Sequence, residues 1–365
     1  MKRLLILLGF LLAFTAACTK AEVDNENDGK QSPIPDSTIE DPIRKVHIFN
    51  ADPTVFHFVS DWLTDTKILY VEKNNSIYQV KFFDIETGES SLVYEDESFI
   101  TDVIVHPIED YLLIHTSNQA DAAILKVVSL EGTILHEMEI ASSELSVNWN
   151  AADSQKILIT AFHEDWTFDI FVFDGYDEDL SIVDVEDPFP KWAGVNQIAS
   201  INISEHALDG GKLQFLNLES DEISISEIDD VVYFDTYGER LFIVTVPKDN
   251  LFTFSMNSLV GETISEWQMP AVSNYSEWVI PEVVWISEDY MLFKGTEKSG
   301  QLDELGSAYN LYAWEGTDYD KLLEGLGPEP LKCSPSGDYC LSGYTSEELI
   351  EKASGDRFEW IKFDE

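Results

Sequence analysis

The sequence predicts an all-β protein built as a single β-propeller, and three observations lead to this prediction. Short apolar runs begin at Ile68, Leu112, Ile157, Ser200, Leu241, Met291 and Cys340. Successive starts are 41 to 50 residues apart, and a four-stranded propeller blade takes about 40 to 50 residues. Around each run, up to four segments show strand-like alternation between turn residues. The two chain ends also carry strand-like segments that complement each other. We therefore expect seven four-stranded blades, with six as the alternative count.

The first 17 residues have the pattern of a signal peptide. Two basic residues precede an apolar stretch from Leu4 to Phe14, which is too short to span a bilayer of about 30 Å as a permanent helix. Cys18 follows two alanines, and this order resembles a bacterial lipobox, in which the cysteine is lipidated and becomes the first mature residue. Thr15 stands where that motif more often has Leu, Val or Ile, and ordinary cleavage beside an incidental cysteine is the alternative. We expect Cys18 to anchor the protein to the extracytoplasmic face of the cell membrane, since two acyl chains suffice for stable anchoring.

Residues 18–44 are expected to form a disordered acidic tether. This stretch is polar, contains three prolines and has few apolar residues, so it cannot bury enough surface to offset the entropy of ordering. Its segment Asp24–Gly29 begins like a calcium-binding loop, but Pro35 occupies the twelfth position, where that loop needs Glu. The propeller domain is therefore assigned to residues 45–365.

The blades follow one another in chain order. The first three each offer four strands, within residues 57–96, 100–140 and 146–185. The next three lie within residues 193–228, 231–269 and 282–325. The seventh shows only three obvious strands, between residues 330 and 364, and Lys45–Asn50 can supply the fourth. A ring closed in this way by an N-terminal strand leaves no exposed sheet edge. A pair of β-sandwiches is the structural alternative, but it does not predict this period.

The composition excludes one class of partner. Asp and Glu number 69 against 22 Lys and Arg, for a net charge of −47. Such a field repels phosphate backbones and anionic lipid head groups, so we expect no nucleic-acid partner and contact with the membrane through the lipid alone. Because 44% of the residues are apolar and 12% aromatic, the acidic residues belong to the surface of a folded domain.

Cys333 and Cys340 lie in one hairpin-like segment. If residues 335–338 form the tip, the two cysteines face each other, and cross-strand Cα atoms about 4.5 to 5.5 Å apart are within reach of a disulfide. Export to an oxidising compartment permits the bond. The alternative is a pair of reduced cysteines that fill small core sites.

The same segment carries a family resemblance. The stretch SPSGDYCLSGY, from Ser334, is similar to the Ser-Pro-Asp-Gly-x-Tyr turn of TolB-type propeller repeats, with Ser336 in place of Asp. The whole layout of lipobox, acidic tether and propeller resembles the YqgU-like propeller lipoproteins of Gram-positive bacteria. This resemblance implies a propeller fold and a membrane location, with six blades rather than seven and no assigned catalytic residues.

Loop lengths indicate where a ligand would bind. The connections from second to third strand and from blade to blade share one end of a propeller, and here they include the long stretches 296–309 and 345–357. Long loops on a rigid scaffold often carry binding sites. The candidate ligand-binding residues expected on this face are His163, Glu164, Asp165, Trp166, Trp192 and Trp278. They would form an aromatic and acidic patch around the central channel; packing of the Trp side chains between blades is the alternative.

The sequence assigns no catalytic residue. It contains no GxSxG, HExxH or Walker motif, and its seven histidines are scattered, so common hydrolase and nucleotide-binding signatures are missing. We expect no cofactor; calcium is the one candidate considered, because hard oxygen ligands suit it. The acids considered for it are Asp174, Asp177, Glu178 and Asp179. A solvated hairpin tip is the alternative for these acids.

Two functions are compatible with this sequence. The favoured one is a non-catalytic, membrane-anchored binding module that contacts a cell-surface protein, a peptide or a wall glycan. The alternative is a surface hydrolase or lyase that acts on a glycan or an ester through carboxylates in the channel.

Overall fold

The computed structural model describes residues 46–119, 121–203, 206–280, 282–306 and 308–363. The described residues belong to one compact unit, Arg44–Glu365. The expected signal peptide, Cys18 and the tether lie outside the described residues. Within the described ranges, no helix has both the length and the apolar character needed to cross a membrane.

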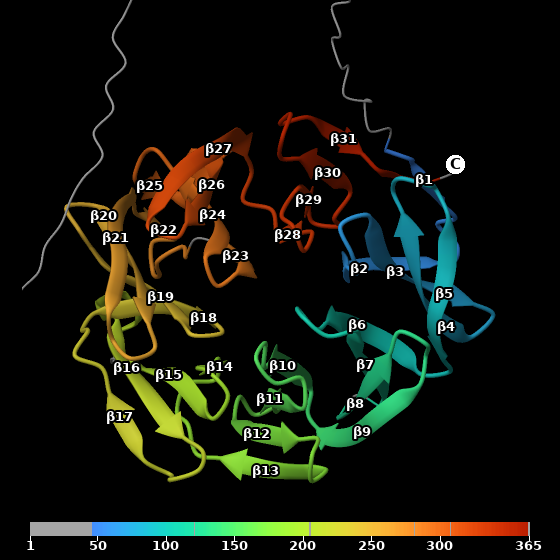
Figure 1. Cartoon of the computed structure of the whole chain (residues 1–365), viewed down its shortest axis with the longest axis horizontal. Helices are drawn as coiled ribbons and strands as arrows, with labels where there is room; N and C mark the ends of the chain where they lie inside the picture. The colour runs from blue at the N-terminus through green and yellow to red at the C-terminus, as the bar shows by residue number, and fades with distance from the viewer. Residues whose placement is uncertain (1–45, 120, 204–205, 281, 307, 364–365) are drawn as a thin grey trace, which may run out of the picture. The chain divides into compact units, whose positions relative to one another are not determined.

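This unit consists of sheets that follow one another in chain order around a centre (Figure 1). Five of these sheets have four antiparallel strands each. The first contains β2 (Phe56–Trp62), β3 (Lys67–Asn74), β4 (Ile77–Asp84) and β5 (Ser90–Asp96). The second contains β6 (Phe99–Val105), β7 (Tyr111–Gln119), β8 (Ala122–Ser129) and β9 (Ile134–Ala141). The third contains β10 (Glu144–Trp149), β11 (Lys156–Phe162), β12 (Phe168–Asp174) and β13 (Asp179–Val183). The other two contain β23 (Val283–Ser287), β24 (Tyr290–Thr296), β26 (Tyr309–Glu315) and β27 (Asp318–Leu326), and then β28 (Leu331–Cys333), β29 (Tyr339–Ser342), β30 (Glu348–Glu351) and β31 (Arg357–Glu359).

An eight-stranded sheet lies between the third of these sheets and the β23 sheet. One half contains β14 (Lys191–Trp192), β15 (Gln197–Ile203), β16 (Gly211–Asn217) and β17 (Ile223–Ile225). The other half contains β18 (Val231–Tyr237), β19 (Arg240–Lys248), β20 (Leu251–Ser258) and β21 (Thr263–Pro270). The two halves are joined by a single residue pair, Gly211 with Val231.

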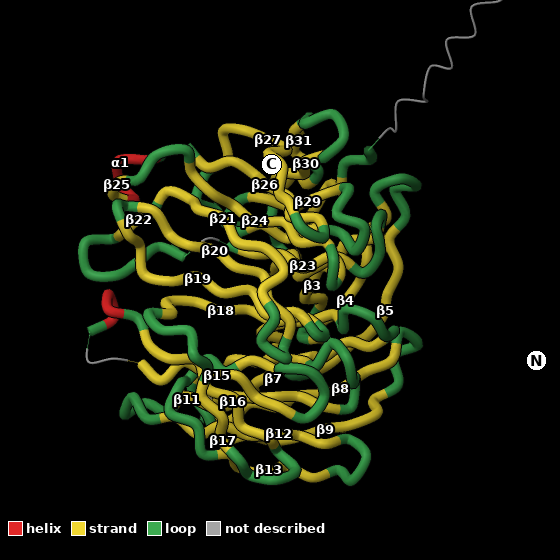
Figure 2. Tube along the Cα trace, turned by 60° about the vertical axis from the view of Figure 1, so that its left-hand side comes forward, coloured by secondary structure: helices red, strands yellow, loops and turns green. Residues whose placement is uncertain are grey.

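Four further small elements lie outside these sheets. A 3-10 helix, η1, covers Ala207–Asp209. Strands β22 (Val272–Ser273) and β25 (Gly300–Gln301) pair in parallel, and α1 (Leu302–Leu305) follows β25 directly. Figure 2 shows these last three elements together on one side of the unit.

The sheets confirm the prediction of a single all-β propeller. The expected count of seven blades is not confirmed, because the described residues form five separate four-stranded sheets and one sheet of eight strands. The apolar periodicity did locate one kind of strand: all seven predicted runs begin in the second strands β3, β7, β11, β15, β19, β24 and β29.

The expected way of completing the last blade is wrong. The fourth strand of that sheet is β31, which comes from the C-terminal segment and pairs with β30. Strand β1 (Phe49–Ala51) instead pairs in parallel with β32 (Ile361–Phe363), in a separate two-stranded sheet. The segment FEWIKF, expected as one strand, is divided at Trp360, whose buried indole Nε1 donates a hydrogen bond of 2.7 Å to the Ser346 carbonyl.

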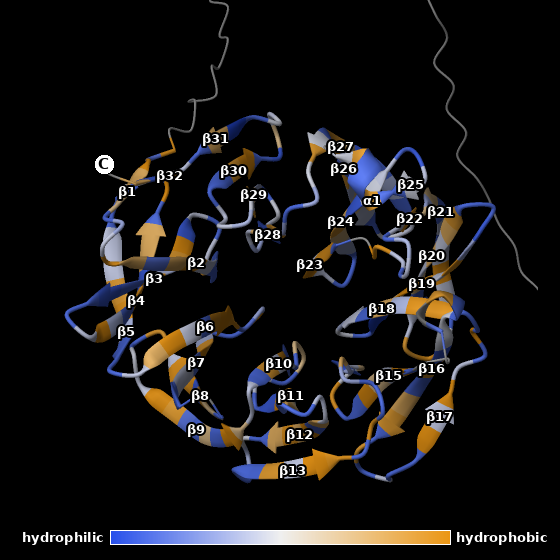
Figure 3. Cartoon of the chain, turned by 180° about the vertical axis from the view of Figure 1, so that it is seen from behind, coloured by the Kyte–Doolittle hydropathy of each residue, from blue (hydrophilic) through white to orange (hydrophobic). Residues whose placement is uncertain are grey.

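The core lies between adjacent sheets. Six second strands contain between three and six consecutive buried residues, namely β3, β7, β11, β19, β24 and β29. Neighbouring sheets cover both of their faces, so burial in these strands is continuous and mostly apolar rather than alternating. The outer strands differ: Ile182 on β13 and Ile223 and Ile225 on β17 are exposed, and Figure 3 shows hydrophobic residues along β17. The apolar surface is therefore concentrated between the sheets but also reaches the outer edge.

Candidate functional site

The expected ligand-binding loop at residues 163–167 is an exposed turn that bonds to itself. The Asp165 carboxylate accepts hydrogen bonds from the Thr167 hydroxyl (2.6 Å) and the Thr167 N–H (3.1 Å), and these bonds lower the pKa of Asp165. His163 Nε2 lies 3.0 Å from the Asp169 carboxylate. Glu164 is exposed, and Trp166 is 95% exposed with a φ of 69°. The loop presents a single free indole to solvent.

The other two expected tryptophans pack inside the propeller. Trp192 is only 4% exposed, and its Nε1 donates to the Asn148 carbonyl at 2.9 Å. Trp278 is half-buried, donates to the Leu208 carbonyl at 3.1 Å and makes an edge contact with the Phe252 ring. The described contacts therefore do not join the three indoles into one surface. Ligand binding by Trp166 stays a prediction.

The main cavity lies at the other end of the ring. It has a volume of about 530 Å³ and is lined mostly by residues 61–65, 105–111, 284–286 and 331–335. Three of these segments connect first to second strands, and because neighbouring strands are antiparallel, these connections lie opposite the loops expected to bind. Five different sheets contribute to the lining. We call this central space the channel cavity.

A second cavity of about 190 Å³ adjoins the channel cavity. The two share Pro107, Tyr237 and Trp285 in their linings. The Tyr237 and Trp285 rings stack with centroids 5.8 Å apart, and Trp285 Nε1 donates to the Asp235 carboxylate at 3.2 Å. Lys191 lies 3.3 Å from the other oxygen of Asp235. The stacked pair thus forms an aromatic wall that the two cavities share.

His106 stabilises the loop that forms one wall of the channel cavity. Its Nδ1 accepts hydrogen bonds from the N–H groups of Ile108 (3.2 Å) and Glu109 (2.8 Å). Its Nε2 lies 3.0 Å from the Asn150 carbonyl, so this nitrogen is the donor. Burial lowers the pKa of His106. The imidazole is therefore neutral and fully used in holding the loop.

Asp61 is a carboxyl in the wall of the channel cavity. Burial raises the pKa of Asp61, and the nearby charge of Asp102 acts in the same direction, while the Trp62 N–H and the charge of Lys332 act against it. The Trp62 N–H donates to Asp61 at 2.8 Å. A partly desolvated carboxyl of this kind favours a cationic neighbour, because a positive charge would offset the cost of its burial.

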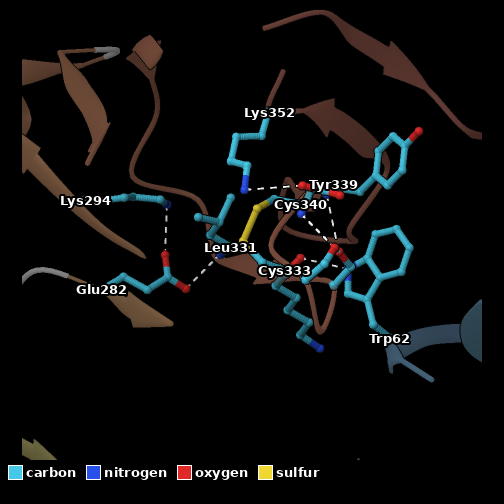
Figure 4. The surroundings of a disulfide bond; sticks show 12 residues. Trp62, Glu282, Lys294, Leu331, Cys333, Tyr339, Cys340 and Lys352 are labelled. Atoms are coloured by element: carbon cyan, nitrogen blue, oxygen red, sulfur yellow. Dashed lines mark hydrogen bonds and ion pairs between the residues drawn. A yellow bond between two sulfur atoms is a disulfide. The ribbon is translucent and has the colours of Figure 1, made fainter. Parts of the chain in front are cut away.

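The last and first sheets meet beside the channel cavity. Trp62 Nε1 donates to the Lys332 carbonyl at 2.9 Å, and the Lys332 ammonium donates to the Ser60 carbonyl. The next residue, Cys333, forms a disulfide with Cys340 directly opposite it in the β28–β29 hairpin. Figure 4 shows this disulfide close to Trp62. The hairpin that carries the disulfide therefore also forms part of the cavity wall.

No group of three or more His, Cys, Asp or Glu is placed to hold a metal ion among the residues that the structure describes. The acids considered for calcium lie at the tip of the β12–β13 hairpin, where Asp174 accepts the Tyr176 N–H at 3.0 Å. The Asp24–Gly29 segment lies outside the described residues. The candidate site is accordingly the channel cavity.

The ring of antiparallel sheets around a central cavity defines a β-propeller protein. Residues 84–343 match the model of the YqgU-like 6-bladed beta propeller domain, and the chain belongs to this family. The resemblance stated from the sequence is therefore confirmed. The family description gives six blades, which differs from the count of seven expected from the apolar runs.

Known proteins are similar to this chain in sequence or in fold, and one of them is named a lipoprotein. The chain is 24% identical over 289 residues to the uncharacterized lipoprotein YqgU of Bacillus subtilis (strain 168), covering 79% of this chain and 80% of the relative. The crystal structure of the uncharacterized protein lmo1340 from Listeria monocytogenes EGD-e matches with a TM-score of 0.79 and 18% identity, over 87% of this chain and 98% of that one. The β-propeller domain of the Trilobed protease from Pyrococcus furiosus matches with a TM-score of 0.55 and 14% identity, over 85% and 97%. These two structural likenesses establish the fold alone.

Proposed function

We propose that this protein is a lipoprotein anchored through Cys18 to the extracytoplasmic face of the cell membrane. Residues 1–17 are the signal peptide, residues 18–44 the tether and residues 45–365 the propeller. The lipobox-like sequence before Cys18 and the homologous Bacillus lipoprotein support this arrangement. Mass spectrometry of the membrane-extracted protein tests it, because an N-terminal peptide beginning at an unmodified residue other than Cys18 contradicts it.

The propeller acts as a non-catalytic binding module, and its channel cavity is the ligand site. The observation that carries this proposal is the volume of about 530 Å³, enclosed by segments from five sheets, since ligand pockets of proteins usually measure about 300 to 1,000 Å³. Because its lining residues lie on strands and short loops, the pocket is already formed before a ligand binds. The partner is a cell-surface protein, a peptide or a wall glycan.

Filling the channel cavity is expected to abolish binding. Ile108 lines the cavity and is 64% exposed, so Ile108→Trp adds an indole there without disturbing the core. The full chain and this variant are used to retrieve ligands from wall and membrane extracts of the source bacterium. Val260→Trp is the matched control, because Val260 is 88% exposed at the β20–β21 tip and does not line the cavity. Ligand recovery that survives Ile108→Trp, or is lost equally in both variants, contradicts the proposal.

A second candidate function is that of a surface hydrolase or lyase acting on a glycan or an ester. The position of Asp61 in the wall of the channel cavity and its pKa, which burial raises and the charge of Asp102 raises further, favour it, because a general acid needs a carboxyl that holds its proton more firmly than usual. Turnover of a glycan or ester substrate that Asp61→Asn abolishes would establish this function. Binding without turnover would favour the non-catalytic binding module instead.

The propeller contains seven four-stranded blades when the eight-stranded sheet is counted as two. The single Gly211–Val231 pair between its halves and the seven apolar runs in second strands support this count. A crystal structure with a continuous hydrogen-bond ladder between β16 and β18 would contradict it.

A further inference from the structure

We infer that the channel cavity binds an organic cation, an ammonium or guanidinium group carried on an apolar stem. This inference rests on the proposed binding function and names the ligand chemistry of the same site. The ligand is either a free amine or a basic side chain of a peptide, and both share this chemistry.

The charges around the cavity are predominantly negative. Its lining contains four carboxylates and one cationic side chain: Asp61, Asp65, Glu109, Asp110 and Lys332. His106 adds no positive charge, since both ring nitrogens hold backbone groups and burial lowers its pKa. The Lys332 ammonium is already directed at the Ser60 carbonyl. An anionic ligand would therefore meet uncompensated negative charge.

Two of the four carboxylates are available to a ligand. Asp65 accepts the Ser336 N–H at 2.7 Å and so fixes the neighbouring hairpin. By contrast, Glu109 and Asp110 are exposed, and no hydrogen bond or ion pair of their carboxylates is found within the described part of the chain. They lie in the His106 loop, directly beside the exposed Ile108. Charge and apolar surface thus occur side by side in the lining of the cavity.

The remaining part of the cavity lining suits an apolar stem. Trp285 and Tyr237 contribute partly exposed aromatic side chains, and Leu63 and Val284 contribute partly exposed aliphatic ones. Aromatic rings attract organic cations through their π faces, and aliphatic walls remove a methylene stem from water at about 0.8 kcal/mol for each CH₂. A hydrated metal ion would gain nothing from such a wall. The combination distinguishes an organic cation from an inorganic one.

General attraction by the acidic surface has to be separated from recognition by this cavity. The whole chain carries a net charge of −47, so any cation accumulates near it at low ionic strength. The channel cavity adds to this general field a set of carboxylates that share one lining with aromatic and aliphatic side chains. If the cavity recognises the ligand, the binding affinity should depend on both the charge and the apolar stem of the ligand.

Isothermal titration of the purified full chain at 0.15 M salt tests this inference with two pairs of probes. The first pair is n-hexylammonium and uncharged n-hexanol. The second pair is a Leu-Lys-Leu tripeptide blocked at both ends and its Leu-norleucine-Leu counterpart. We expect each charged probe to bind at least about ten times more tightly than its neutral partner, because the neutral probe cannot form the charge-assisted interaction with the cavity carboxylates. Tighter binding of the tripeptide assigns the ligand to a peptide, and equal binding assigns it to a free amine.

A charge-matched pair of variants locates the site. Glu109→Gln/Asp110→Asn is expected to weaken binding of the charged probes about threefold to tenfold, since both carboxylates are solvent-exposed. The control, Asp177→Asn/Glu262→Gln, removes the same charge at exposed hairpin tips away from the cavity and is expected to leave affinity unchanged. Equal weakening by both pairs, or neutral probes that bind as tightly as charged ones, overturns the inference.

Failure of this inference differs from failure of the proposed function. If the extracts yield a neutral or anionic ligand that Ile108→Trp excludes and Glu109→Gln/Asp110→Asn does not affect, the cavity is a binding site for another chemistry. If Ile108→Trp changes neither ligand recovery nor probe binding, both proposals fail.

Discussion

The Trp360→Ala variant is expected to lose about 3 to 5 kcal/mol of the free energy of unfolding, the usual cost of deleting a fully buried aromatic side chain. Trp360 is 0% exposed and lies in a core cluster with Phe49, Tyr70 and Leu349. These neighbours belong to the N-terminal strand, the first sheet and the last sheet. The substitution therefore removes the side chain around which the two ends of the propeller meet.

Urea denaturation followed by circular dichroism measures this loss. The control is Trp166→Ala, because Trp166 is 95% exposed and truncation of a surface side chain usually changes stability by less than about 0.5 kcal/mol. Phe49→Ala is a second variant at the same junction, since its ring centroid lies 4.6 Å from that of Tyr70. A loss below about 1 kcal/mol for Trp360→Ala would show that the ends of the chain do not stabilise the ring.

The fold class was predictable because one kind of strand repeats with a strong signal. The second strand of each sheet is covered on both faces, so Ile157–Ala161 in β11, for example, is continuously buried. Continuous apolar runs of this kind are visible in the sequence without any knowledge of the partners. First and fourth strands are half-exposed or very short, as in β14 with two residues, and their sequences do not separate strand from loop.

The closure of the chain was not predictable from strand propensity. Both β1 and the segment FEWIKF look like strands, and an open edge favours pairing of any two strands. Which pairing forms depends on Trp360, whose buried indole interrupts the segment and leaves only Ile361–Phe363 to pair with β1. A tryptophan in a strand-like run gives no sign of whether it interrupts that run.

Loop length did not indicate the channel cavity. The long loops lie at one end of the ring, whereas the channel cavity forms where short first-to-second-strand loops from several sheets converge. A usable signal was present in the tryptophans. Four of them occur in first strands, namely Trp62, Trp149, Trp192 and Trp285, and Trp62 and Trp285 line the cavity.

The Lys126→Met variant is expected to lose about 3 to 5 kcal/mol of the free energy of unfolding, because it leaves a buried carboxylate without its partner. Lys126 on β8 is 8% exposed, and its Nζ lies 2.5 Å from the Asp96 carboxylate at the end of β5. The Tyr94 hydroxyl donates to the same oxygen at 2.7 Å, and the Ser98 N–H donates to the other at 2.8 Å. This ion pair connects the first sheet to the second.

The acid dependence of stability follows from the pKa of Asp96. Burial alone would raise this pKa, but the hydrogen bonds from Lys126, Tyr94 and Ser98 together lower it below its ordinary value. A carboxyl whose pKa is lowered in the folded state contributes stability above its unfolded pKa of about 4, and this contribution is lost as the pH falls through the folded pKa. The difference in unfolding free energy between wild type and Lys126→Met should therefore be full at pH 7 and decrease below pH 4.

Urea denaturation at pH 7, 5 and 3 measures this difference, and two further variants separate the ion pair from general effects of charge. Lys321→Met is the control, because Lys321 pairs with Glu297 at 2.8 Å on the surface and exposed pairs contribute at most about 1 kcal/mol. Lys126→Met/Asp96→Asn removes both charges, and its loss is expected to be smaller than that of Lys126→Met alone, since no unpaired charge stays buried. A double variant that is less stable than Lys126→Met at pH 7 would mean that Asp96 stabilises the two sheets through Tyr94 and Ser98 rather than through its charge pair.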